Sequence, residues 1–127
     1  MANKVKLGTR PKNFKRVVTF PMLEGGEGSL EATFKYRTKT EFGKFVDGLF
    51  EAAKEEKPAD GKFSMADLMG KTRDKNAAYL LEVLEGWNLD EPLNRETAEQ
   101  FCDELPGAAA EIMETYRRAV VEGRLGN

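Results

Sequence analysis

The sequence predicts an α+β fold in which an N-terminal β-hairpin is followed by a bundle of four to five α-helices. Two observations predict it. Apolar residues alternate with polar ones between residues 14 and 36, and further along the chain they recur every three or four residues. Glycine and proline separate these segments where turns and helix ends are expected. The length of 127 residues fits one domain, so we expect residues 1–13 to be a flexible basic arm and residues 14–127 to form that domain.

The first two predicted elements are strands that pair as a hairpin. Apolar and polar residues alternate in "FKRVVTFPM", which begins at Phe14, and again in "LEATFKYR", which begins at Leu30. Between them, the three glycines of "LEGGEGS" suit a reversal of the chain. Because Pro21 has no backbone N–H to donate, the first strand is expected to lie at an edge of the sheet or to end there.

The segment after the hairpin has the period of an amphipathic helix that ends before Pro58. Thr38 and Glu41 have the spacing of a capping box, and Thr40 is a competing N-cap. The apolar face of this helix consists of Phe42, Phe45, Val46, Leu49, Phe50 and Ala53. We expect it to cover the apolar face of the hairpin, because a two-stranded hairpin alone buries too little surface to be stable.

Two further helices are expected between residues 64 and 86. Ser64 can cap a short helix whose apolar face contains Met65 and Met69. A second helix covers "RDKNAAYLLEVLEG", and Gly86 is expected to end it in the left-handed conformation. Trp87 follows directly, so its ring is expected to fold back onto the last helical turn and to hold the next loop in place.

The last two helices are marked by a cap and by a proline. Asn94 can cap "RETAEQFCDEL", and Pro106 begins "PGAAAEIMETYRRAVVEG", because proline is tolerated in the first turn of a helix. Tyr116 falls on the buried side of this last helix, and Gly123 is expected to end it. The residues to which we assign a structural clamp are Gly86, Trp87, Pro106 and Tyr116.

No catalytic, cofactor-binding or metal-binding residues emerge from the sequence, and we expect the protein not to be an enzyme. The chain has no histidine, which excludes serine–histidine, cysteine–histidine and histidine–zinc chemistry within one chain. Its single cysteine, Cys102, is expected to be a buried and inert thiol. The glycines of "EGGEG" join two strands, whereas loops that bind phosphate lie between a strand and a helix.

The charge of the chain is unevenly distributed. Residues 1–44 contain ten basic and four acidic residues, and residues 45–127 contain ten basic and eighteen acidic ones. This asymmetry suits head-to-tail association between copies, and equally a polyanionic partner. The alternative function is therefore a small nucleic-acid-associated regulatory protein that uses the basic arm, although the arm lacks the aromatic residues and the motif typical of such proteins. No apolar segment approaches the ~20 residues of a membrane span, and no signal peptide is evident, so we expect no membrane partner and a cytoplasmic location.

From Val83 onward the sequence resembles the tail assembly chaperones of long-tailed bacteriophages and prophages. The resemblance lies in the order and spacing of Gly86-Trp87, Asp90, Asn94, Phe101, Pro106-Gly107-Ala108-Ala109, Ile112, Tyr116, Ala119 and Arg124 to Asn127. The hairpin and the phenylalanine-rich helix upstream also look similar to that family, so the shared layout extends over nearly the whole chain.

This resemblance implies a non-catalytic protein of the host cell cytoplasm, without cofactors. Members of the family bind the tape measure protein, keep its apolar helical segments from aggregating and help to recruit the tail tube protein through a longer form made by ribosomal frameshifting. Our chain looks like the short form, and we expect a homo-oligomer. The residues expected to meet the client are Phe42, Phe45, Phe50, Met65 and Met69.

Overall fold

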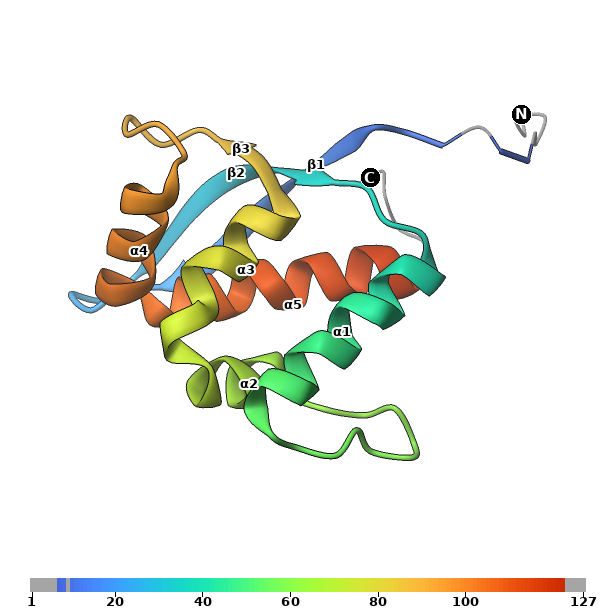
Figure 1. Ribbon diagram of the computed structural model, residues 1–127. Helices are drawn as coiled ribbons and strands as arrows, with labels where there is room; N and C mark the ends of the chain where they lie inside the picture. The colour runs from blue at the N-terminus through green and yellow to red at the C-terminus, as the bar shows by residue number, and fades with distance from the viewer. Residues whose placement is uncertain (1–6, 9, 123–127) are drawn as a thin grey trace.

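The computed structural model describes residues 7–8 and 10–122, and these form a three-stranded sheet packed with five α-helices (Figure 1). The predicted α+β class is confirmed. The elements in chain order are β1 (Asn13–Pro21), β2 (Glu27–Lys35), α1 (Lys39–Ala53), α2 (Met65–Lys71), the 3-10 turn η1 (Arg73–Lys75), α3 (Asn76–Val83), β3 (Leu84–Trp87), α4 (Arg95–Glu104) and α5 (Pro106–Glu122). The predicted arm lies largely outside the described residues, and β1 begins at its last residue, Asn13.

Strands β1 and β2 form the predicted antiparallel hairpin, with Val18 opposite Leu30. The turn that joins them uses Gly25 and Gly26, whose φ angles of 96° and 73° are accessible to glycine at little cost. Strand β1 lies at an edge of the sheet, as the proline at its end predicted. The sequence did not predict β3, which pairs with the other side of β2 and gives the order β1-β2-β3.

Side-chain caps begin three of the helices where the sequence predicted them. The Thr38 hydroxyl accepts the backbone N–H of Glu41, and the Glu41 carboxylate accepts the backbone N–H of Thr38, so Thr38 and not Thr40 caps α1. Ser64 accepts the N–H of Asp67 at the start of α2. Asn94 caps α4 in the same way. These caps satisfy N–H groups that lack a partner in the first helical turn.

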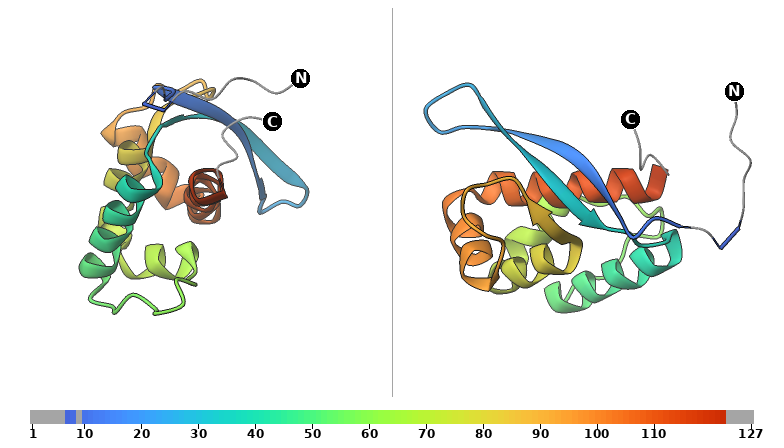
Figure 2. Two further views of the ribbon diagram at one scale, coloured as in Figure 1. Left: turned by 90° about the vertical axis from the view of Figure 1, so that its right-hand side faces the viewer. Right: turned by 90° about the horizontal axis from the view of Figure 1, so that it is seen from above.

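Helix α5 lies at the centre of the molecule. Figure 2 shows it between the sheet on one side and the layer that contains α2 on the other. It contacts β1 and the four other α-helices. The sequence predicted that α1 covers the hairpin, which is wrong: α5 packs against β1, whereas α1 packs on α2 and α5. Seven buried residues run along α5, so its apolar surface is broad enough to serve both layers.

Gly86 does not end a helix, and this prediction from the sequence is wrong. Helix α3 stops at Val83, and Leu84 already has extended angles, with φ −98° and ψ 133°. Gly86 lies in β3 opposite Thr33 and outside the left-handed region. Strand pairing with β2 therefore decides the conformation of this segment, rather than the local preference of glycine.

Candidate partner-binding site

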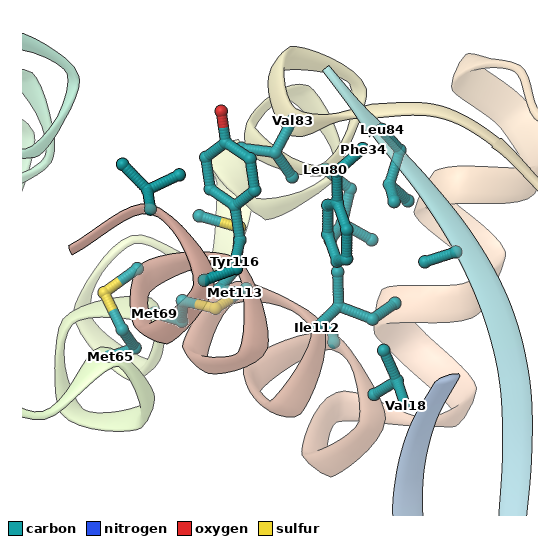
Figure 3. Close-up of a cluster of buried hydrophobic side chains, with 14 of the residues drawn as sticks. Val18, Phe34, Met65, Met69, Leu80, Val83, Leu84, Ile112, Met113 and Tyr116 are labelled. Atoms are coloured by element: carbon teal, nitrogen blue, oxygen red, sulfur yellow. The ribbon is translucent and has the colours of Figure 1, made fainter. Parts of the chain in front are cut away.

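Four of the five residues predicted to meet a client lie inside the fold. Phe42, Phe50, Met65 and Met69 are between 1% and 6% exposed. Figure 3 shows Met65 and Met69 on α2, beside Met113 of α5. Their apolar stripes face the core because α1 and α2 both pack on α5. In the folded chain these four side chains therefore present very little surface to a partner.

Phe45 is the member of this group that remains partly accessible. The guanidinium of Arg37 lies over its ring, 4.7 Å from the ring centre, and Tyr79 meets it edge-on with ring centres 6.2 Å apart. Arg37 is held in this position by the Glu82 carbonyl at 2.8 Å and by the Glu82 carboxylate at 3.1 Å. Phe45, Tyr79 and Arg37 form a fixed aromatic and cationic surface beside α3, which we call the Phe45 surface.

Tyr116 is buried at the centre of an aromatic cluster. Its ring lies 5.2 Å from that of Phe34, 5.8 Å from that of Phe42 and 6.0 Å from that of Phe14, measured between ring centres. Burial raises the pKa of the phenol, and the hydrogen bond from Arg37 acts against that shift. The phenol therefore stays neutral at physiological pH. Pro106, the other structural residue on this helix, opens α5 as predicted.

Trp87 holds the loop that follows β3. Its indole N–H donates to the carbonyl oxygen of Glu91 at 2.7 Å. Its ring packs against Phe101 of α4, with ring centres 5.3 Å apart. From the sequence we expected the Trp87 ring to fold back onto the end of α3, whereas the ring packs on α4. A cavity of about 190 Å³ adjoins this contact, lined by Leu89, Glu91 and Leu105 among others.

A second and larger hollow is a groove between α2 with α3 on one side and α4 with the start of α5 on the other, which we call the α2–α5 groove. It encloses about 690 Å³. Met69 and Ala77 are buried at its base, and Cys102 and Ala110 are half-buried there. The exposed charged residues of its lining are Arg73, Asp74, Glu99 and Asp103.

Sequence reasoning missed the α2–α5 groove. The signal available for it is a set of small residues on α2, α3 and α5, namely Ala66, Gly70, Ala77, Gly107 and Ala110. Small side chains let another chain approach the helix backbones closely. Their meeting depends on packing between segments about forty residues apart, which periodicity within one helix does not show.

The chemistry of the α2–α5 groove suits binding. Burial, with a smaller contribution from the Glu99 carboxylate, raises the pKa of the Cys102 thiol to about 11, so the reactive thiolate is scarce at neutral pH. Within residues 7–8 and 10–122, no three acidic or cysteine side chains gather as metal ligands. An apolar base with carboxylates at the rim fits a partly apolar segment that carries basic residues.

Comparison with known proteins gives a match over the whole chain. Residues 1–127 match the model of a family described as phage tail assembly chaperone. Neither the curated proteins nor the solved structures provide a match. No helix within the described part of the chain has the length and apolarity to cross a membrane.

Proposed function

Because the chain belongs to the phage tail assembly chaperone family, we propose that it is a non-catalytic chaperone that binds the tape measure protein and promotes assembly of the tail tube. The observation that carries this proposal is the family match over residues 1–127, together with the resemblance in residue order from Val83 onward. Residues 14–127 act as the chaperone domain and residues 1–13 as a basic arm.

The proposed client is an apolar helical segment of the tape measure protein. Such segments aggregate in water unless their apolar faces are covered. Binding takes place in the host cell cytoplasm before the tail is complete. A longer form of the chain, made by ribosomal frameshifting, recruits the tail tube protein. Several copies along one client add avidity, so the protein acts as a homo-oligomer.

We place the first contact with the client at the Phe45 surface. Phe45 and Tyr79 are partly exposed there, and Arg37 is fixed beside them by Glu82. Contact through Phe42 or through the methionines of α2 would require α1 or α2 to move away from α5, because these side chains are buried. They can join the contact only after such a movement.

A phage that carries a nonsense mutation in this gene tests the proposal. We expect filled heads without tails by electron microscopy, and tails restored when the intact chain is supplied from a plasmid. A plasmid that encodes the Tyr116→Phe variant is the control. This variant is expected to be slightly less stable but still folded, so it should also restore tails. Normal tails in the absence of the chain would contradict the proposed function.

A further inference from the structure

We propose that the α2–α5 groove binds residues 4–7 of a second copy of this chain, so that copies associate head to tail. This inference rests on the self-association in the proposed function and assigns its two surfaces. The tape measure protein is proposed to bind elsewhere, at the Phe45 surface. Self-association and client binding can therefore be tested separately.

The α2–α5 groove offers carboxylates that pair with none of the described residues. Asp74 on one rim and Asp103 on the other form no ion pair with any residue in the described part of the chain, whereas Glu99 pairs with Arg95 at 2.7 Å. Among the described residues that line the groove, Arg73 is the only basic one. The rim is therefore net acidic, above the apolar base formed by Met69 and Ala77.

The N-terminal segment carries the complementary chemistry. Residues 1–23 contain six basic residues and no acidic one. In Lys4-Val5-Lys6-Leu7 the two apolar side chains would lie on one face of an extended chain, toward the base of the groove. The flexible stems of the lysines would let their ammonium groups reach the rim carboxylates. Leu7 is 93% exposed, so no described residue of its own chain covers it.

The residues that follow this segment lie at the far end of the molecule from the groove. Arg10 is paired with Glu41 at 2.9 Å and lies over the Tyr36 ring, which holds the chain beside the start of α1. Figure 1 shows the start of α1 at the opposite end of the molecule from α4, which borders the groove. Residues 4–7 are at most six residues from Arg10, a reach of about 20 Å. Binding to a second copy is therefore favoured over binding to its own groove.

A contact of this kind joins the N-terminal segment of one copy to the α2–α5 groove of another. Each pair of copies therefore still has one free segment and one free groove. It generates a ring or an open chain of copies rather than a closed dimer. An open chain of chaperones would follow a long client and would present one Phe45 surface per copy. The interaction is electrostatic at its rim, so it should weaken as salt concentration rises.

Sedimentation velocity of the full chain over a range of concentrations tests the inference. We expect the wild-type mass to rise with concentration. Two charge reversals, Lys4→Glu with Lys6→Glu in one variant and Asp74→Lys with Asp103→Lys in another, should each weaken association at least tenfold. Mixing the two variants should restore it, because the intact segment of one meets the intact groove of the other.

The matched control carries Lys44→Glu and Lys62→Glu, which change the net charge by the same amount at exposed sites away from the groove. It should associate like the wild type. Circular dichroism verifies that every variant is folded. A monomer at all concentrations, or association that neither reversal weakens, would overturn the inference. Capture of the tape measure protein by such a chain would show that the proposed function survives that result.

Discussion

The hydroxyl of Tyr116 donates a hydrogen bond to the carbonyl oxygen of Lys35 at 2.7 Å, which joins the last helix to the end of the hairpin. The same hydroxyl accepts from the Arg37 guanidinium at 3.1 Å. Arg37 in turn reaches the carbonyl of Glu82 near the end of α3. One buried oxygen thus connects α5 with the segment between β2 and α1 and, through Arg37, with α3.

Replacing Tyr116 with phenylalanine keeps the ring cluster and removes this connection. We expect a loss of about 1–2 kcal/mol in the free energy of unfolding, because buried polar partners lose a hydrogen bond. Urea unfolding followed by circular dichroism measures it. Tyr36→Phe is the control, since no hydrogen bond of the Tyr36 hydroxyl is formed within the described residues, and it should change stability by less than about 0.5 kcal/mol. Equal losses in both variants would contradict the role of Tyr116.

Trp87→Phe removes the donor to the Glu91 carbonyl and keeps an aromatic ring near Phe101. We expect a loss of about 1 kcal/mol and faster amide hydrogen exchange in the loop of residues 88–93, because this loop loses its tie to β3. Exchange in β1 and β2 should stay as in the wild type. Unchanged exchange in the loop would show that packing alone holds it.

Asn94 provides a test of the cap of α4. Asn94→Ala should cost about 1 kcal/mol, because the N–H of Thr97 loses its acceptor. Asn94→Gly should cost only a few tenths of a kcal/mol, since glycine is tolerated at this position. Thermal unfolding of the two variants compares them directly. The reverse order of stability would be inconsistent with a side-chain cap.

Cys102 should react slowly with iodoacetamide in the folded chain. Burial raises its pKa to about 11, so the rate should rise about tenfold per pH unit between pH 7 and 10. In urea the pKa returns to its ordinary range, and the rate at pH 8 should increase by at least tenfold. Because the folded pKa is the higher one, this thiol stabilises the fold below its unfolded pKa, and that contribution is lost as the pH rises toward 11. Fast alkylation of the folded chain at pH 7 would contradict the burial.

Much of the fold could be predicted from local patterns. The alternation in β1 and β2, the capping residues Thr38, Ser64 and Asn94, and the proline that opens α5 all act within a few residues of where they lie. Such signals are complete in a short window of sequence. For this reason the hairpin and the starts of α1, α2, α4 and α5 were predicted correctly, whereas the helix expected from Arg73 begins as a 3-10 turn and α3 starts at Asn76.

Strand β3 could not be predicted in the same way. Its four residues follow α3 without a turn, and the apolar spacing of Leu80, Val83 and Leu84 continues the period of the helix. The strand exists because β2, about fifty residues earlier, offers an open edge. A break in register beside Thr33 and Phe34 further hides the pairing.

The site residues were harder to predict, because an apolar helical stripe looks the same whether it faces a core or a client. Met69 and Phe45 both lie on such stripes, yet Met69 is 4% exposed and Phe45 remains partly accessible. The difference depends on how α1 and α2 pack on α5. Arg37 carried no local signal either, since its hydrogen-bonding partner Tyr116 is 79 residues away.

Separate substitutions can distinguish a residue of the hydrophobic core from a residue that contacts the client. Met69→Ala should cost about 2–5 kcal/mol of stability, as expected for a buried side chain that leaves a cavity. Phe45→Ala should cost less, and it should weaken binding of a tape measure fragment at least tenfold. Val17→Ala is the control and should leave binding unchanged, because Val17 on β1 is 62% exposed and lies on a different element from Phe45. Full binding by Phe45→Ala would exclude the Phe45 surface as the first contact.

The central claim is that this chain binds and shields the tape measure protein, and light scattering of a purified tape measure fragment tests it most directly. We expect the fragment to aggregate alone and to remain clear when the chain is present in equimolar amount, with both proteins eluting together from a size-exclusion column. A fragment that aggregates equally fast with and without the chain, and that elutes apart from it, would contradict the account.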